Sequence, residues 1–357
     1  MSGAGYEHTR LLSRRQVLRG ATAFGLAAAT GTLLPGCSPD GRDRRLNTLK
    51  SDGPPETSTI RLYSLPDVQC IAAQYMAEPF LREEGFTDVQ YPSHSPKAVL
   101  ETLQKGEFDF AVAYAATVIP MIEAGAPLVL LGGVHVGCWQ VFANQDITSL
   151  RDFRGKTVSL VSARFNDGVF LAMTLNEVGL DLHKDVNIVN HSPADYARIL
   201  SSGEVDALVA FPPVSLELRL KGIGKIVISS VTDPPWSNYY CCTAVTTRDW
   251  MEKHPAATRR ALRAVLKGAD VVTNDPDGTA RLMVERGYSN NFNYTCDILK
   301  EIPYNRIWQD FDPVDSVRFY ALRMKQAGLI ESTPEEILKK GTDFRYLNEL
   351  KLELKEA

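Results

Sequence analysis

The sequence predicts an α/β fold made of two similar units in tandem, followed by a helical tail. Strand-like and helix-like segments alternate between residues 59 and 228, and alternation at this spacing is typical of parallel βαβ units. The segment KGEFDFAV at 105–112 is echoed by SGEVDALV at 202–209. This weak repeat indicates that the second unit is built like the first.

In the first unit, glycine residues mark the ends of the expected helices. Gly85, Gly106 and Gly125 each follow a helix-like segment, and glycine readily adopts the left-handed conformation that ends a helix. The expected strands are 59–63, 88–91, 108–112 and 128–131, and the expected helices are 68–84, 96–105 and 115–124.

The second unit and the tail show the same patterns. A short helical lead-in is expected at 149–153, with strands at 157–161, 186–189, 207–210 and 225–228 and helices at 167–178, 193–202 and 212–220. The spacing of apolar residues then predicts tail helices at 255–274, 277–286, 313–327 and 333–340. We expect this tail to cover the first unit.

The N-terminal segment, residues 1–37, predicts an export signal. A basic stretch precedes an apolar run at 21–34, which is shorter than the roughly 20 residues of a membrane span. SRRQVLR at 13–19 resembles the twin-arginine export motif, and LLPGC at 33–37 resembles a lipobox in which Cys37 becomes lipidated. The alternative is an ordinary cleaved signal with an incidental arginine pair and cysteine.

Composition separates a tether from the folded part and excludes one class of partner. Residues 38–58 are polar and rich in turn-forming residues, so we expect a flexible tether. The remaining chain of roughly 300 residues is long enough for two domains. The net charge of −4 gives no indication of the basic surface that nucleic acid requires.

Motifs in the folded part carry a family resemblance. In order, they are KGEFD at 105–109, LRDFRGKTV at 150–158, SSGEVDA at 201–207 and YLNEL at 346–350. Their order and spacing resemble the periplasmic substrate-binding proteins of the nitrate, taurine and alkanesulfonate type, including the thiamine-pyrimidine-synthase-like group. The resemblance extends from about residue 58 to the C-terminus.

The resemblance implies a two-lobed periplasmic-binding-protein fold of type II, with two crossing strands as a hinge and the helical tail on lobe 1. Lobe 1 is expected to comprise 59–143 plus 243–357, and lobe 2 to comprise 144–242. From the points where the βαβ series stops and restarts, we expect the crossings near 138–144 and 239–245.

The same resemblance implies a function. It predicts the solute-binding component of an ABC-type importer, which captures a small molecule and passes it to a permease without catalysis or a cofactor. We expect a monomer at the periplasm or cell surface, held to the membrane by the lipid on Cys37.

Ligands of parallel α/β sheets bind beyond the carboxyl ends of the strands, where helix N-termini expose backbone N–H groups. The segment 162–168, directly after the fifth expected strand, is the strongest candidate. Three aromatic residues between 236 and 240 indicate a stacking wall for a flat or apolar ligand. The predicted ligand-binding residues are Pro66, Gln69, Tyr114, Ala115, Ser162, Arg164, Phe165, Asn166, Phe211, Trp236, Tyr239 and Tyr240.

Each candidate has a structural alternative. Arg164 fits a solvated side chain, Asn166 fits a helix cap, and the aromatic residues fit ordinary packing. Cys138 is expected close to Cys241 and Cys242, because the crossing strands are neighbours. That arrangement fits a soft-metal or thiol-reactive site, but buried inert thiols or one disulfide are favoured, so no metal site is predicted.

Two other functional classes stay open. Pyrimidine synthases share the resembled fold, although the sequence holds no Gly-x-Ser-x-Gly, His-Glu-x-x-His or phosphate-loop motif. A ligand-sensing lipoprotein that docks on a membrane receptor has the same fold. The predicted ligand is a small organic molecule with one acidic or polar end, such as an aromatic carboxylate, a sulfonate or a heterocycle.

Overall fold

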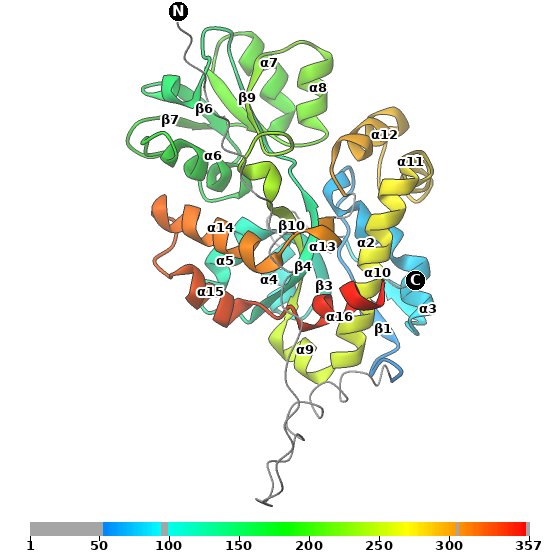
Figure 1. Ribbon diagram of the computed structural model, residues 1–357. Coiled ribbons are helices and arrows are strands. Elements are labelled where there is room, and N and C mark those ends of the chain that lie inside the picture. Colours follow the sequence, from blue (N-terminus) through cyan, green and yellow to red (C-terminus); the bar gives the residue numbers. More distant parts are fainter. Residues whose placement is uncertain (1–52, 94–98, 305–306, 355–357) are drawn as a thin grey trace, which may run out of the picture. The chain divides into compact units, whose positions relative to one another are not determined.

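The first sheet of the protein combines strands that precede the second sheet along the chain with one that follows it (Figure 1). The computed structural model describes residues 53–93, 99–304 and 307–354, so the export signal, Cys37 and most of the tether lie outside the described residues. The sheet has the order β3-β10-β4, with β10 antiparallel to both neighbours. Its strands are β3 (Phe110–Tyr114), β4 (Leu128–Val136) and β10 (Tyr240–Thr247).

A parallel pair of short strands continues this sheet. β1 (Thr59–Arg61) pairs with β2 (Asp88–Gln90). A single parallel bridge from Leu62 to Phe110 places β1 beside β3. The extended order is therefore β2-β1-β3-β10-β4.

The second sheet repeats this order. Its five strands run β7-β6-β8-β5-β9, with β6 parallel to β7 and β8 and with β5 antiparallel to β8 and β9. In each sheet the antiparallel strand directly follows, along the chain, the last strand of the other sheet: β5 comes after β4, and β10 comes after β9. The tandem similarity predicted from sequence is confirmed in the topology. The strands are β5 (Gln140–Ala143), β6 (Thr157–Leu160), β7 (Asn187–Asn190), β8 (Ala207–Ala210) and β9 (Lys225–Ser229).

The chain passes between the sheets twice, as expected, and each passage begins before the residues at which the crossing was expected. β5 belongs wholly to the second sheet and β10 wholly to the first, so the chain passes between sheets at 137–139 and at 230–239. The two passages touch at Gly137, where a Cβ atom would lie 2.5 Å from Cα of Val231 and φ is +54°. Glycine is required there by both the space and the backbone. The lobe boundaries near 143 and 242 stay predictions.

Helices cover both sheets, and proline explains one departure from expectation. The helix expected at 68–84 is split into three pieces, and Pro79 in the first turn of the last piece explains the second break. Around the first sheet lie η1 (Gln69–Ile71), α2 (Ala72–Met76), α3 (Glu78–Glu83), α4 (Val99–Gln104) and α5 (Ala115–Glu123). Around the second lie η2 (Leu150–Phe153), α6 (Asn166–Asn176), η3 (Pro193–Asp195), α7 (Tyr196–Ser201) and α8 (Val214–Leu220).

The C-terminal tail packs mainly on the first sheet, as predicted. α10, α13, α15 and α16 all contact β4, and α14 additionally reaches α6, as the yellow-to-red ribbons of Figure 1 show. After η4 (Trp236–Asn238) the helices are α9 (Arg248–Lys253), α10 (Pro255–Asn274), α11 (Pro276–Glu285), α12 (Phe292–Glu301), α13 (Ile307–Asp310), α14 (Pro313–Gln326), α15 (Pro334–Gly341) and α16 (Arg345–Glu353).

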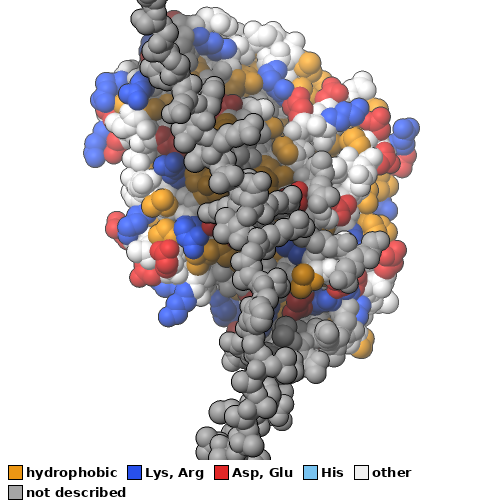
Figure 2. Space-filling model, in the orientation of Figure 1, with side chains coloured by type: hydrophobic (Ala, Val, Ile, Leu, Met, Phe, Trp, Pro, Cys, Tyr) orange, Lys and Arg blue, Asp and Glu red, His pale blue; other side chains and the backbone are white. Residues whose placement is uncertain are grey.

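The surface carries charges of both signs. In Figure 2, Lys and Arg side chains are interspersed with Asp and Glu side chains over the visible face. Among the described residues, no helix combines the length and apolar character needed to cross a bilayer.

Candidate ligand-binding site

A cavity of about 330 Å³ lies between the elements of the two sheets. The first sheet contributes the loop after β1, the start of α4, β3, α5 and Cys242 of β10. The passage at 138–139, the start of α6 and Phe211 form the remaining wall. The lining residues are Tyr63, Leu65, Val68, Cys70, Ile71, Val99, Leu100, Glu101, Val112, Ala113, Tyr114, Thr117, Pro120, Met121, Cys138, Trp139, Arg164, Phe165, Asn166, Val169, Phe211 and Cys242.

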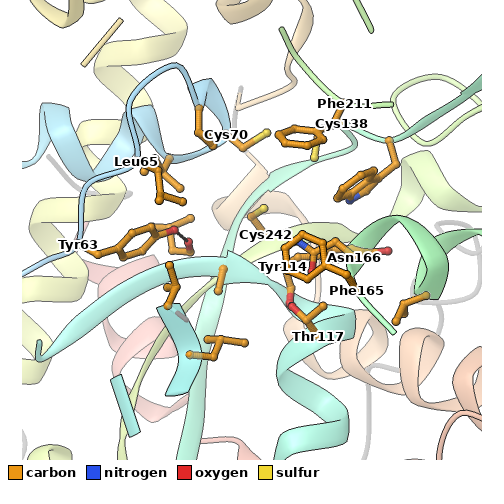
Figure 3. A pocket seen from close by; sticks show the side chains of 18 of the residues that line it. Tyr63, Leu65, Cys70, Tyr114, Thr117, Cys138, Phe165, Asn166, Phe211 and Cys242 are labelled. Atoms are coloured by element: carbon orange, nitrogen blue, oxygen red, sulfur yellow. Dashed lines mark hydrogen bonds between the residues drawn. The ribbon is translucent and has the colours of Figure 1, made fainter. Parts of the chain in front are cut away.

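Some of the predicted ligand-binding residues meet at this cavity (Figure 3). Tyr114 is the last residue of β3, and Phe211 follows β8 directly. Arg164, Phe165 and Asn166 lie where β6 leads into α6. These positions follow the carboxyl ends of strands, and the binding role of each residue stays a prediction.

A tight turn holds the segment 162–168 in place. At Gly168, in the first turn of α6, a Cβ atom would lie 2.4 Å from the carbonyl oxygen of Ala163, so only glycine allows the turn to fold back so closely. The carboxylate of Asp167 accepts a hydrogen bond from the N–H of Val161. Asp167 is buried, and burial raises the pKa of its carboxyl. Both contacts fix Arg164 and its neighbours beside the cavity.

Other predicted residues are close to the cavity but do not line it. Pro66 is exposed, between the lining residues Leu65 and Val68. Gln69 turns into the protein, where its Nε2 lies 3.5 Å from Oγ1 of Thr295. Ala115 is buried at the start of α5, and the hydroxyl of Ser162 accepts from the N–H of Arg164 within the turn.

The predicted aromatic wall at 236–240 packs elsewhere. Trp236 is fully buried, with its ring 5.2 Å from those of Phe170 and Phe319. Tyr239 stacks on Phe319 at 4.0 Å. The hydroxyl of Tyr240 lies 2.8 Å from the carbonyl oxygen of Phe311, against the C-terminal tail. The structure therefore does not bring these three residues to the cavity.

Different aromatic residues form the cavity walls, and sequence reasoning missed two of them. Trp139 lines the cavity, with its ring 4.9 Å from Phe211 and 5.8 Å from Tyr114. Tyr63 lines the opposite part, after β1. Trp139 comes directly after Cys138 within the expected first crossing. Its position between the two lobes could have identified it as a cavity residue.

Two buried donors on these walls lack partners. The hydroxyl of Tyr114 and the indole N–H of Trp139 have no hydrogen-bond partner among the described residues. Burial raises the pKa of Tyr114 well above its ordinary value, so the hydroxyl stays protonated and can donate. Arg164 is exposed at the cavity. An acceptor group on a bound molecule would satisfy such donors, since buried polar groups are normally paired.

Cysteines gather at one wall of the cavity. Figure 3 shows Cys70, Cys138 and Cys242 at the cavity, and Sγ of Cys138 lies 3.3 Å from Sγ of Cys241. The predicted proximity of Cys138 to the vicinal pair is confirmed. The described cysteines are all free thiols.

A buried histidine lies beside these thiols. Nε2 of His135 is 2.9 Å from the carbonyl oxygen of Cys70, and Nδ1 is 3.1 Å from that of Val136. Both carbonyls accept, so both ring nitrogens are best satisfied as donors. Although burial alone would lower it, the neighbouring Cys242 raises the pKa of His135 to about 9. Hydrogen bonds from Cys138 and Cys241, together with His135, hold the pKa of Cys242 well below its ordinary value.

The two sheets have the same strand order, exchange one antiparallel strand each and enclose a cavity between them. This is the architecture of the periplasmic-binding proteins. The chain belongs to the NMT1/THI5-like family, whose profile matches residues 72–279. No curated protein sequence matches the chain.

Solved structures confirm the predicted fold class. The chain is similar to the periplasmic nitrate-binding protein NrtA from Synechocystis PCC 6803 at 14% identity, with 85% of this chain and 90% of that chain covered and a TM-score of 0.68. It is similar to the alkanesulfonate-binding protein SsuA from Xanthomonas axonopodis pv. citri, bound to MOPS, at 15% identity, with coverage of 78% and 96% and a TM-score of 0.61. The desulfurization enzyme DSZB is similar at 15% identity, with coverage of 83% and 99% and a TM-score of 0.59.

Proposed function

We propose that the protein is the solute-binding component of an ABC-type importer. It captures a small organic molecule in the cavity between the two sheets and delivers it to a membrane permease. The observation that carries this proposal is the cavity itself, about 330 Å³ in volume and lined from both sheets. Its apolar walls with a few polar groups are typical of small-molecule sites.

The cavity walls favour a flat or apolar ligand with one acceptor group. Tyr63, Tyr114, Trp139, Phe165 and Phe211 supply aromatic surface. The unpartnered hydroxyl of Tyr114 and N–H of Trp139 favour an acceptor, and an arginine is well suited to a carboxylate or sulfonate. An aromatic carboxylate, a sulfonate or a heterocycle fits these features. The related sulfonate-binding protein bound to MOPS supports the sulfonate class.

Delivery requires export and a change between two states. The proposed protein is a monomer outside the cytoplasm, tethered by a lipid on Cys37, and its two halves close on the ligand by a hinge at 137–139 and 230–239. The family membership supports a protein that docks on a permease.

Thermal-shift screening tests the proposal. The purified protein is heated with a panel of aromatic carboxylates, sulfonates and heterocycles, and each hit is analysed by mass spectrometry for product. We expect one class to raise the unfolding temperature, with a stabilisation of roughly 3–4 kcal/mol at 100 to 1,000 times the Kd, and with no product. Arg164→Gln should weaken an anionic hit about tenfold. A panel without any hit, or a hit that Arg164→Gln and Tyr114→Phe both leave unchanged, contradicts the proposed site.

An enzyme is the second candidate function. The desulfurization enzyme among the structural relatives, and the low-pKa thiol of Cys242 on the cavity wall, favour it. Product formation from a hit, abolished in Cys242→Ser, would establish catalysis in place of binding and delivery.

A further inference from the structure

We infer that Cys138, Cys241 and Cys242 form a three-sulfur site for one Cu(I) ion at the wall of the cavity. This inference goes beyond the proposed solute binding and does not depend on it. The three Sγ atoms all lie within 4.8 Å of one another, and those of Cys138 and Cys241 are 3.3 Å apart.

The sulfur spacing matches a trigonal metal site. A metal ion about 2.3 Å from each of three sulfurs, the usual metal–thiolate distance, holds the sulfurs about 4 Å apart. This value lies between the 3.3 Å that separates the sulfurs of Cys138 and Cys241 and the 4.8 Å within which all three sulfurs lie. Small side-chain adjustments would therefore seat the ion without movement of the strands.

An irregularity in the sheet brings neighbouring cysteines to the same side. Successive side chains of a regular strand point to opposite faces, which would separate Cys241 from Cys242. The pairing of β10 with β4 shifts register between Tyr240 and Cys242 and again between Cys242 and Thr243. Such bulges re-aim side chains, and this one places both sulfurs with Cys138.

The donor set selects a soft ion. Thiolates favour Cu(I) over hard cations, and a carboxylate is absent from this sulfur cluster among the described residues. His135 does not complete a tetrahedral set, because both its ring nitrogens face backbone carbonyls. The sulfur of Cys70 hydrogen-bonds with Cys138, but it lies outside the group of sulfurs that are all within 4.8 Å of one another. A set of three mutually close sulfurs suits trigonal Cu(I) better than tetrahedral Zn(II).

The cavity gives the ion a route to the site. Cys138 and Cys242 line the cavity, whereas Cys241 lies behind them with 1% of its surface exposed. On binding, each coordinating thiol that still carries a proton releases it to solvent and forms a Cu–S bond. No electron is transferred, because copper enters as Cu(I).

Anaerobic titration with Cu(I) against a colorimetric Cu(I) chelator tests the inference. The sample is the full chain carrying Cys37→Ser, reduced and freed of reductant. We expect one Cu(I) per chain, bound at least 100-fold more weakly in each of Cys138→Ser, Cys241→Ser and Cys242→Ser. The matched control Cys296→Ser, on α12, should bind like the parent, and Cys70→Ser should retain the stoichiometry. Zn(II) should not displace the bound Cu(I).

Thiol protection provides a readout that needs no variant. With one Cu(I) bound, Cys138 and Cys242, which line the cavity, should be alkylated more slowly than in the copper-free chain, whereas Cys296 reacts at the same rate in both. Absence of stoichiometric binding, equal loss in Cys70→Ser, or unchanged affinity in all three cluster variants would overturn the three-sulfur site. Unprotected cluster thiols at full copper loading would overturn it as well.

Discussion

Tyr114 and Tyr240 are both buried tyrosines, yet their hydroxyls have different surroundings. Tyr114 lines the cavity from β3, and its buried hydroxyl has no partner among the described residues. The hydroxyl of Tyr240 instead lies 2.8 Å from the carbonyl oxygen of Phe311. Its ring covers Gly133, where a Cβ atom would approach the ring to 2.0 Å. The first hydroxyl therefore still lacks a hydrogen-bond partner, and the second is bound to the tail.

Tyr114→Phe should lower the ligand affinity and leave the stability of the protein unchanged. The change removes only a hydroxyl, and that hydroxyl makes no hydrogen bond within the described protein. We expect the affinity for a ligand with an acceptor group to fall about five- to tenfold, as for one lost hydrogen bond. The free energy of unfolding without ligand should stay nearly constant. Calorimetric titration and denaturant unfolding measure the two quantities.

Tyr240→Phe is the matched control with the opposite expectation. Loss of the hydrogen bond to Phe311 should lower the free energy of unfolding by about 1 kcal/mol, while ligand affinity stays the same. If Tyr240→Phe weakens binding and Tyr114→Phe does not, the aromatic segment at 236–240 belongs to the site after all.

At the residue scale, cavity residues next to a strand were predictable, whereas packing against a distant helix was not. Arg164, Phe165 and Asn166 were found because they come shortly after a recognisable strand. Trp236 and Tyr239 carry the same aromatic signal, but they pack on Phe319 of α14. That contact is non-local, so no local pattern could distinguish a packed aromatic residue from one that faces a cavity.

At the scale of elements, Glu123 ties α5 to the tail. Its Oε1 accepts hydrogen bonds from the backbone N–H groups of Glu331 and Ser332, at 2.8 and 2.5 Å. Although partial burial alone would raise it, these donors hold the pKa of the Glu123 carboxyl below its ordinary value of 4.5. The carboxylate form therefore stabilises the contact between α5 and the segment before α15.

This contact should depend on pH in a defined direction. Because the folded pKa of Glu123 is lowered, its stabilisation is fully present above pH 4.5 and is lost as the pH falls through the folded value. Glu123→Gln should lower the unfolding temperature at pH 7, and the gap to the parent should shrink as the pH falls below 4.5. Glu252→Gln, at an exposed position on α9, is the control. A gap that stays constant between pH 7 and pH 3 contradicts the assignment.

The crossing of α2 and α10 depends on one glycine. A Cβ atom at Gly268 would lie 2.2 Å from the carbonyl oxygen of Ala73, and a backbone atom cannot move away as a side chain can. Gly268→Ala should destabilise the protein by about 2 kcal/mol or more, although alanine favours helix more than glycine does. Asn274→Ala, at the exposed end of α10, should be nearly neutral. Equal unfolding temperatures for both variants would show that the helices separate easily.

The order of elements was predictable, but their pairing was not. Alternating patterns and helix-ending glycines indicated the strands and helices of both units. β5 follows the first unit along the chain but joins the second sheet, and β10 follows the second unit but joins the first. The sequence does not reveal this exchange, because β10 pairs with β3 across more than 120 residues. The expected hinge strands are therefore ordinary sheet strands, and the passages at 137–139 and 230–239 connect the sheets.

At the scale of the whole molecule, the two sheets form two halves with the cavity between them. Both sheets have the same strand order, and the two passages and helix contacts such as α14 with α6 link them. Two halves with few connections can rotate about those passages. Small-angle scattering should show a smaller radius of gyration with a saturating hit than without it. An unchanged radius would contradict closure while leaving binding intact.

The central claim is that the cavity between the sheets binds the solute. Ala113 lines the cavity from β3, and a tryptophan there would fill much of the space of about 330 Å³. Calorimetric titration of the parent, of Ala113→Trp and of the control Ala194→Trp with one screening hit tests the claim most directly. We predict one ligand per chain for the parent and for the control, and no detectable binding for Ala113→Trp. Unchanged affinity in a folded Ala113→Trp variant would contradict the account.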